Sequence, residues 1–502
     1  MYSNLKPQKN LGSWHGSSSY HGHNLLDELN AVTNSSKSLK FVILGAGMAG
    51  LCAAYELEKR GHTCVILEAE SGHVGGRVRT LHFGDGLYGE AGAMRIPEVH
   101  YLTRHYIKEL GLSLRRFVND NPEAYCYLRG QRERVQNVDQ LRRLYQLEDH
   151  ERQLTSDDIW IKAVASHLAT LTEEEIAQLR FDLPKTKTIL NWDRQSLRQM
   201  FDESGFSEEA IKWLGVVYGL ETFMSTSALE HIRQEYDQVW LNDFDEIVGG
   251  TEQLPLTMID RLKSKPRMGC EVVRLERDDE SHNAAAVYLD KDQPKREVGD
   301  FVLCTIPAPV LARLDTPFSP KKQRAIRNLH YDSAIKVFAI SDRRFWESDD
   351  RIFGGGSISD LPLTTTYYPS DNAQTKDSKI SAQPGVMLAS YTRGAFARRL
   401  GSFSLKERHY VVQEALKQLH PQFKSEGMLR SMVSWNWNDY KWTGGSYSFF
   451  MPGQHSALHQ HIIAPEGRIF FAGEHASLDH SWIQGALESS LRAVKSMLLA
   501  AG

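Results

Sequence analysis

The sequence predicts an α/β protein organised around a Rossmann-like, dinucleotide-binding unit. An apolar strand over residues 41–44 runs into the glycine-rich turn 45–50 and then into a helix, and a second strand over 63–67 ends on Glu68. A strand, a glycine turn, a helix and an acid closing the next strand form the context that a dinucleotide fingerprint requires. At 502 residues the chain exceeds one ordinary core, so we expect two or more packed regions.

Each position of the turn has a physical role in that fingerprint. Gly45 allows the tight turn, Gly47 lets the backbone approach a pyrophosphate, and Gly50 lets the helix pack closely on the strand. The helix N-terminus offers unpaired N–H groups and the positive end of its dipole to the phosphates. Glu68 lies where a carboxylate accepts from ribose hydroxyls. The surrounding pattern disfavours the alternative, an ordinary glycine-rich turn.

The segment Gly75-Gly76-Arg77 narrows the choice of cofactor. Paired glycines let the chain pass close to a ligand, and an arginine beside them can hold a phosphate bidentately. The chain resembles the amine-oxidase family of FAD enzymes, whose first motif reads GxGxxGL, then a glutamate, then GGR. The resemblance implies FAD rather than NAD, bound in a domain of the glutathione-reductase/amine-oxidase type. Glu68 would then bind the adenosine ribose and Arg77 the pyrophosphate.

Composition and charge exclude several other classes. The chain is 41% apolar and 24% charged, which is typical of a soluble globular protein, and its net charge of −4 gives no reason to expect a nucleic acid or an anionic membrane as partner. Five scattered cysteines favour a reducing compartment, with neither a disulfide framework nor a metal-ligand spacing. No secretory signal or membrane-length apolar run is seen, so we expect a cytoplasmic protein. Residues 1–38 read as a poorly ordered arm, with a short docking helix at 25–29.

Arg95 is the first candidate for binding a substrate. Pro97 suits the first position of a helix, so Arg95 would precede a helix N-terminus, a place that suits an anion. Capping a neighbouring helix or pairing with Glu90 is an equally good interpretation from the residues alone. The segment Gly92–Pro97 resembles that of the L-amino-acid oxidases within the family. That resemblance implies that Arg95 clamps the substrate carboxylate, which substrates of plain monoamine oxidases lack.

The rest of the chain divides into further regions. Residues 39–100, 246–320 and 432–502 are expected to form the discontinuous FAD-binding domain, 111–245 a helical region, and 321–431 a mixed-sheet substrate domain. Helices are predicted over 140–147, 156–171, 173–179, 196–201 and 207–219. Some L-amino-acid oxidases carry an active-site histidine before the glycine pair at 249–250. This chain has Gln234 about there with His231 nearby, so we expect no histidine base and place His231 at the surface or in packing.

Lys336 lies on a strand predicted over residues 335–340, on the same face as Phe338 and Ile340. One interpretation is an edge lysine that extends to water. The resemblance implies instead a catalytic lysine that holds a water against flavin N5, where a cation would favour reduction of oxygen. Strands over 364–369 and 386–391 carry Tyr367 and Tyr391, which the residues alone identify only as aromatics. By resemblance, Tyr391 completes the carboxylate clamp and Tyr367 forms a pocket wall.

The C-terminal block returns to the flavin. Monoamine oxidases of the family attach FAD to a cysteine in this region, and no cysteine follows Cys304 here, so the resemblance implies non-covalent FAD. A strand over 468–474 resembles the second FAD motif, and Trp482, which opens the final helix, resembles the aromatic wall of the substrate cage. Ser481 stands where relatives often have a glycine whose carbonyl binds the substrate amine. The resemblance therefore implies these cofactor-binding residues: Gly45, Ala46, Gly47, Met48, Ala49, Gly50, Glu68, Ala69, Gly76, Arg77, Ala93, Met94, Arg95, Val272, Gly473, Glu474, Trp482 and Ile483.

These resemblances imply an FAD-dependent L-amino-acid oxidase that takes an L-amino acid and oxygen to a 2-oxo acid, ammonia and hydrogen peroxide, working as a homodimer. The alternatives are an enzyme like L-tryptophan 2-monooxygenase, another amine oxidase of the same fold, and a non-catalytic flavoprotein used as a binding module. Aromatic candidates around the pocket favour apolar and aromatic substrates. The acids Glu235, Asp237 and Asp439 leave arginine or lysine open as substrates.

Overall fold

A parallel sheet at the centre of the dinucleotide-binding unit matches the predicted βαβ pattern. The computed structural model describes residues 24–32, 37–180, 183–278, 280–423 and 427–501. Its parallel sheet has the order β2 (Thr63–Leu67), β1 (Lys40–Leu44), β13 (Phe301–Cys304) and β21 (Ile469–Phe471). Helix α2 (Met48–Lys59) makes the crossover from β1 to β2. Segments more than 400 residues apart thus meet in one sheet.

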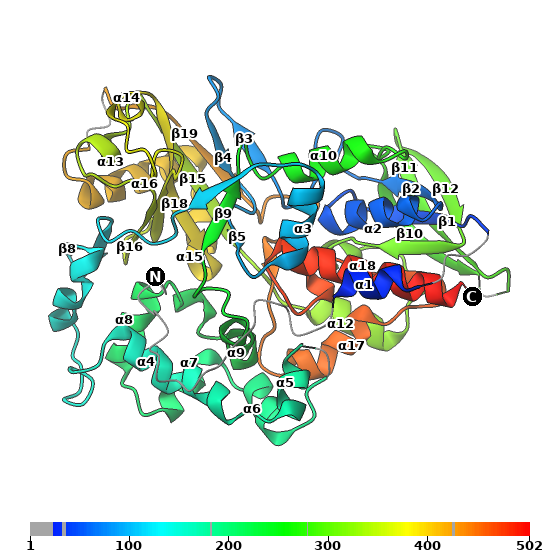
Figure 1. Ribbon diagram of the computed structural model, residues 1–502, viewed down its shortest axis with the longest axis horizontal. Coiled ribbons are helices and arrows are strands. Elements are labelled where there is room, and N and C mark those ends of the chain that lie inside the picture. The colour runs from blue at the N-terminus through cyan, green and yellow to red at the C-terminus, as the bar shows by residue number, and fades with distance from the viewer. Residues whose placement is uncertain (1–23, 33–36, 181–182, 279, 424–426, 502) are drawn as a thin grey trace.

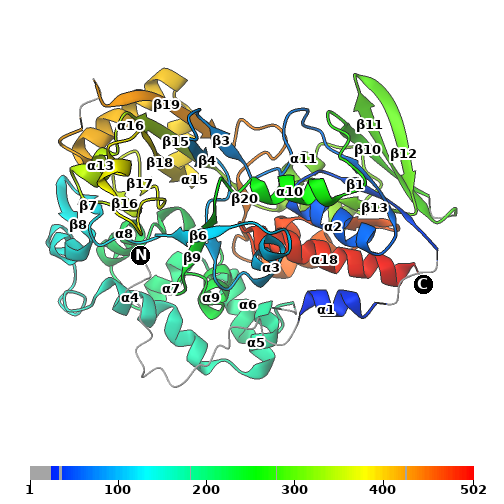
Figure 2. The same ribbon diagram turned by 45° about the horizontal axis from the view of Figure 1, so that its top comes forward.

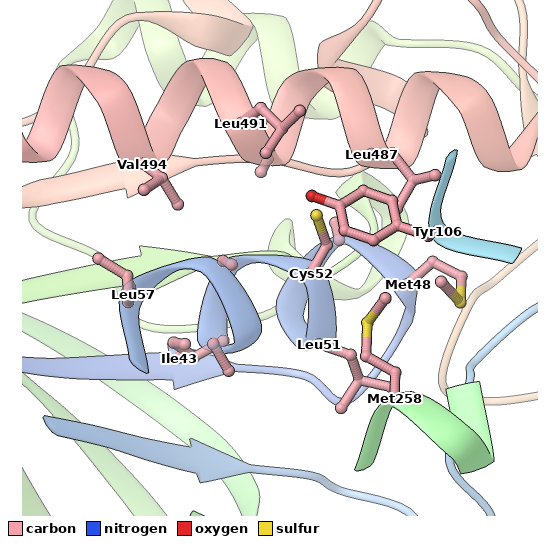
Figure 3. Packing of buried hydrophobic residues seen from close by; sticks show 14 of the residues in the cluster. Ile43, Met48, Leu51, Cys52, Leu57, Tyr106, Met258, Leu487, Leu491 and Val494 are labelled. Carbon is pink, nitrogen blue, oxygen red and sulfur yellow. The ribbon is translucent and has the colours of Figure 1, made fainter. Parts of the chain in front are cut away.

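Two hydrophobic clusters cover the two faces of this sheet. Phe41 and Ile43 of β1 point into a cluster with α2 and α18 (Ile483–Ala500), whereas Val42 and Leu44 point into a cluster with the strands of a second, antiparallel sheet. Figure 3 shows α2 and α18 packed side by side through their apolar side chains. Because both faces are buried, the central strands read as continuous apolar runs rather than alternating ones.

The antiparallel sheet lies on the face of the parallel sheet opposite α2 and α18, and it consists of β10 (Glu271–Asp278), β11 (Asn283–Asp290) and β12 (Gln293–Gly299). Helices α10 (Gln253–Arg261) and α11 (Ala308–Leu311) lie around the same unit (Figure 2), as does α12 (Pro320–Asn328), which is labelled in Figure 1. Together with α17 (Gln460–Ile463), these elements complete the dinucleotide-binding unit.

A mixed seven-stranded sheet forms the second unit (Figure 1). Its strand pairs are antiparallel except for the parallel pair of β16 and β7, which confirms the predicted mixed sheet. The strands run in the order β19 (Leu429–Asn436), β15 (Ala334–Ser341), β18 (Gly385–Arg393), β17 (Thr365–Tyr368), β16 (Gly355–Ser359), β7 (Tyr125–Leu128) and β8 (Gln131–Arg134). The segments that connect these strands also contain helices: α13 (Phe345–Ser348), α14 (Ser378–Ser381), α15 (Gly394–Gly401) and α16 (Leu405–Leu419).

The helical region has its own apolar core and lies below the seven-stranded sheet in Figure 1. It comprises α4 (Ser156–Ala163), α5 (Glu173–Arg180), α6 (Lys187–Arg194), α7 (Leu197–Glu203), α8 (Glu208–Val217) and α9 (Ala228–Tyr236). The helix predicted over 140–147 is a 3-10 helix, Val135–Leu144, and the one over 156–171 breaks at Val164 into α4 and a 3-10 helix. The region starts later than expected, because 114–134 supplies β6 (Leu114–Phe117), β7 and β8.

The helix predicted to begin at Pro97 is wrong in its start. Ile96–Pro97 form the short strand β5, which pairs with β9 (Phe244–Ile247), and helix α3 (Tyr101–Glu109) begins four residues later. β5 lies at the edge of its sheet, where a proline without an N–H group is tolerated. Arg95 therefore precedes a strand rather than a helix N-terminus.

Helix α1 (Leu25–Asn30) confirms the short docking helix expected near the N-terminus. It packs on α18 (Figure 2), and its Leu29 is fully buried while Glu28 pairs with Lys495 at 2.9 Å. Residues 1–23 and 33–36 of the predicted arm lie outside the described residues.

The five cysteines are buried and unpaired. Across the described ranges, no group of three or more histidine, cysteine, aspartate or glutamate side chains is placed to hold a metal ion. None of the helices in those ranges is both long and apolar enough to cross a membrane.

Candidate active site

A cavity of about 520 Å³ runs along the carboxyl ends of the parallel strands. Gly45 follows β1, Glu68 follows β2 and Thr305 follows β13, and all three line it. Ligands of open parallel sheets bind at this edge, because the loops after the strands diverge there. We call it the sheet-edge cavity.

The glycine turn has the geometry that its sequence predicts. Gly45 has φ +106°, and a Cβ on Gly50 would lie 2.0 Å from the Gly45 carbonyl oxygen, so α2 packs on β1 only with glycine there. A Cβ on Gly47 would meet no atom within 4 Å, because this position faces the cavity. The N-terminus of α2 has no side-chain cap, which leaves its first N–H groups for a ligand.

Glu68 is held at the end of β2 by backbone donors. Its carboxylate accepts from the N–H of Ala46 at 2.7 Å and from that of Glu70 at 2.8 Å. Burial raises the pKa of Glu68, and these two hydrogen bonds oppose the rise. Each carboxylate oxygen keeps a second lone pair, so the group fits hydroxyl donors of a ribose. The uncapped helix, the open Gly47 position and this acceptor fit FAD.

Arg77 and Glu474 form an ion pair that the sequence does not predict. Arg77 Nη1 lies 2.5 Å from Glu474 Oε1, although the residues are 397 positions apart. The carboxylate also accepts from the N–H and hydroxyl of Ser448 and from the N–H of Ser481. Burial alone would raise the pKa of Glu474, but Arg77 above all lowers it, to about 2. The pair joins the loops after β2 and β21 across the sheet-edge cavity.

Lys336 lies on β15 in the interior of the seven-stranded sheet, so the edge-lysine interpretation is wrong. Its Nζ donates to the carbonyls of Glu90 at 2.8 Å and Gly92 at 2.7 Å, and to the sulfur of Met94 at 3.3 Å. Burial lowers the pKa of Lys336, and the Glu90 carboxylate opposes that shift. Lys336 lines the sheet-edge cavity and anchors the segment that leads to Arg95.

A second cavity of about 170 Å³ adjoins the first. Because Arg95 and Arg393 both line it, we call it the arginine cavity. The two cavities share several lining residues, so they meet along one wall: Gly92, Ala93, Tyr391, Tyr447, Ser481, Trp482 and Ile483.

Arg95 is oriented by polar and aromatic neighbours. One nitrogen, Nη1, donates to Asn119 Oδ1 at 2.7 Å and to the Tyr367 hydroxyl at 3.0 Å. The guanidinium lies 4.8 Å from the centre of the Trp240 ring, and Trp240 in turn packs 5.7 Å from Trp482. No aspartate or glutamate of the described residues forms an ion pair with Arg95, so its remaining donors are available to a ligand.

The structure brings the other expected substrate residues to the same place. Tyr367, Tyr391, Trp482 and Ser481 line the arginine cavity. Ser481 has φ +68°, in the left-handed region that favours glycine, which agrees with the glycine expected there in relatives. Of the acids considered for substrate recognition, Glu235 lines this cavity, Asp237 pairs with Arg180, and Asp439 is exposed.

The expected cofactor residues divide between the two cavities. Met94 and Arg95 line the arginine cavity, and Ala46 and Gly50 line neither, since Gly50 supports the helix packing and Ala46 is buried beneath the turn. The residues that line the sheet-edge cavity are Gly45, Gly47, Met48, Ala49, Glu68, Ala69, Gly76, Arg77, Ala93, Val272, Gly473, Glu474, Trp482 and Ile483.

Several residues of the arginine cavity were missed or misplaced by the sequence analysis. His231 is buried, bonds to Thr226 at 2.9 Å and lines the cavity, so its expected surface position is wrong and its packing role is right. Burial lowers the pKa of His231 to about 4. Arg393 was not predicted as a site residue, although it lies two positions after Tyr391 in β18, where strand alternation places both side chains on one face.

The fold and its adjoining cavities define a dinucleotide-binding protein with a ligand site beside the cofactor site. A family model described as flavin containing amine oxidoreductase matches residues 48–498. The chain belongs to that family and is thus a flavin-dependent oxidoreductase, which confirms the predicted fold class and family.

Relatives of known name agree with this assignment. An L-amino-acid oxidase of Vipera ammodytes ammodytes is 30% identical over 476 residues, covering 93% of this chain and 94% of that protein. A Bacillus subtilis (strain 168) relative is 33% identical over 474 residues, and the match covers 92% of this chain and 95% of the relative. A structure of putrescine oxidase bound to putrescine superposes with a TM-score of 0.71 at 19% identity, covering 92% of this chain and 99% of that one. At that identity the likeness shows the fold.

Proposed function

We propose that the chain is an FAD-dependent L-amino-acid oxidase, which converts an L-amino acid, oxygen and water into a 2-oxo acid, ammonia and hydrogen peroxide. When bound, FAD supplies the acceptor for the hydride that leaves the substrate Cα. The proposal includes non-covalent FAD in the sheet-edge cavity and a homodimer, as the sequence resemblance implies.

The observation that carries the proposal is the guanidinium of Arg95 beside the cofactor cavity. An arginine without a carboxylate partner among the described residues is complementary to a substrate carboxylate, which it can hold through two parallel N–H···O bonds. A diamine such as putrescine carries positive charge at both ends and would be repelled by Arg95 and Arg393. The L-amino-acid oxidase relatives support the same substrate class.

The other side chains of the cavity would orient the substrate. Tyr391 would complete the carboxylate clamp with its hydroxyl, while the rings of Tyr367 and Trp482 wall the Cα. The backbone carbonyl of Ser481 would accept from the amine, since this residue lies where both cavities meet. Catalysis would then depend on positioning more than on a strong side-chain base.

The test compares Arg95→Ala with the wild type and with Arg104→Ala, which removes a half-exposed arginine paired with Asp245. We expect the Arg95 variant to keep its flavin and to raise KM by about 10- to 100-fold, as loss of a charge-assisted pair implies. The Arg104 variant should behave like the wild type. Unchanged kinetics in Arg95→Ala would refute the clamp.

Three further measurements separate the rival functions. Equal amounts of peroxide and 2-oxo acid would exclude a monooxygenase that forms an amide. Bleaching of the flavin by an L-amino acid without oxygen would exclude a non-catalytic flavoprotein. Consumption of simple amines as readily as amino acids would overturn the proposed substrate class.

A further inference from the structure

Arg393 is a second guanidinium in the arginine cavity, and the carboxylate clamp does not use it. It is the last residue of β18, two positions after Tyr391, so both side chains project from one face of the sheet. Its guanidinium lies 5.1 Å from the centre of the Phe223 ring and 5.2 Å from that of Tyr391. These aromatic contacts hold it in place from the helical region on one side and the seven-stranded sheet on the other.

The hydrogen-bonding capacity of Arg393 is almost unused. A guanidinium has five N–H donors. In the part of the chain that the structure describes, Arg393 donates only to the Gly219 carbonyl, at 3.4 Å, and forms no ion pair with an aspartate or glutamate. The buried Arg344, by contrast, pairs with Asp371 at 2.6 Å. A cation left open toward a cavity is a binding group for an anion.

The charge of Arg393 is retained in this environment. Burial alone would lower its pKa, but Tyr391, Tyr447 and Tyr367, together with Asp332, raise it above the usual arginine value. The acids Asp120 and Glu235 also line the cavity and would suit a basic side chain, although Asp120 already accepts from the Asn119 amide at 3.1 Å. Burial raises the pKa of Glu235 to about 7, and its carboxylate already accepts from the Trp160 indole at 3.0 Å. Glu235 is therefore a poorer charge partner than Arg393.

We propose that the preferred substrates are L-amino acids whose side chain ends in a carboxylate, with Arg393 holding that second carboxylate while Arg95 holds the first. The inference rests on the proposed oxidase function and names the substrate class of the same site. An apolar side chain would fill the cavity but leave the charge of Arg393 without an anionic partner. A dicarboxylate satisfies both guanidiniums, and their positive charges select it over its amide.

The test uses the flavin-loaded enzyme and pairs of substrates that match in shape. Peroxide formation is measured with L-glutamate against L-glutamine and with L-aspartate against L-asparagine. We expect kcat/KM to be about 10- to 100-fold higher for the better of the two acids than for its amide, as replacement of a charge-assisted bond implies. Equal or higher kcat/KM for both amides, or for L-leucine, would overturn the inference without needing any variant.

Variants then assign the preference to Arg393. Arg393→Met should lower kcat/KM for the preferred acid by about 10- to 100-fold and lower it less than threefold for L-methionine. Arg393→Lys keeps the charge but not the planar fork, so it should restore part of the preference. Arg399→Met, an exposed arginine on the following helix α15, is the matched control and should behave like the wild type. An acid preference that survives in Arg393→Met would also overturn the assignment.

The outcomes distinguish this inference from the proposed function. Oxidation of L-leucine or L-phenylalanine without preference for the acids would leave an L-amino-acid oxidase and reject the role of Arg393. Failure of every L-amino acid to bleach the flavin without oxygen would reject both.

Discussion

Replacing Arg77 by methionine should destabilise the protein by leaving a buried carboxylate without its cation. Glu474 is only 5% exposed, and burial alone would raise its pKa, but Arg77, followed by His480 and the Ser481 N–H, lowers it from 4.5 to about 2. At about 1.4 kcal/mol per pKa unit, that shift corresponds to roughly 3 kcal/mol. Breaking a buried ion pair by removing one partner costs about 3–5 kcal/mol. We therefore expect the free energy of unfolding to fall by at least about 3 kcal/mol at pH 7.

The sign of the pH dependence follows from the lowered pKa. A carboxyl whose folded pKa lies below its unfolded value stabilises the fold above the unfolded pKa, and this contribution is lost as the pH falls through the folded pKa. For Glu474 the window lies between pH 4.5 and about 2. The difference between wild type and Arg77→Met should thus be largest near neutral pH and shrink as the pH falls below 4.5.

The assay is urea unfolding of the flavin-free protein, followed by fluorescence, so that lost contacts to FAD do not add to the effect. Adding Glu474→Gln to the Arg77 variant should recover much of the loss, because the uncompensated charge is then removed. Arg296→Met, which removes a half-exposed partner of Glu276, is the control and should cost less than about 1 kcal/mol. A loss below about 1 kcal/mol in Arg77→Met, or no recovery in the double variant, would refute the reasoning.

Other expectations concern the cofactor site and its neighbours. Gly50→Ala should destabilise the fold by about 1–3 kcal/mol or more, because its Cβ would lie 2.0 Å from the Gly45 carbonyl oxygen. Gly47→Ala has open space around its Cβ and should keep its stability but lose flavin affinity. Thermal unfolding measures the first effect and flavin titration the second, and unweakened flavin binding by Gly47→Ala would contradict this expectation. Lys336→Met should slow reoxidation of the reduced enzyme by oxygen more than its reduction by substrate, which stopped-flow absorbance measures separately; equal slowing would argue for a structural role only. Ser481→Gly should leave the melting temperature nearly unchanged, since relief of the left-handed strain offsets the added freedom of the unfolded chain; a large loss would show that the serine side chain is needed. Denaturation followed by ultrafiltration should release all of the flavin, and retained yellow protein would contradict non-covalent binding.

Much of the dinucleotide unit could be predicted because its signals are local. The strand, turn and helix around Gly45–Gly50 lie within a short stretch, and the alternation of β1 between two clusters leaves an apolar run that reads as a buried strand. Helix α1 was predictable for the same reason, from five residues of apolar and acidic pattern. The start of α3 was not, because pairing of Ile96–Pro97 with β9 overrode a favourable helix signal at Pro97.

The sequence by itself determined the cofactor turn, and its resemblance to a family led to the proposal of Arg95 and Tyr391 as substrate residues. Only the tertiary structure decided which charges are compensated. It paired Arg77 with Glu474 across 397 positions and left Arg393 lining the arginine cavity without an ion-pair partner among the described residues. The physical reason is that backbone conformation follows neighbours along the chain, whereas the partner of a buried charge comes from whichever distant segment the fold brings beside it.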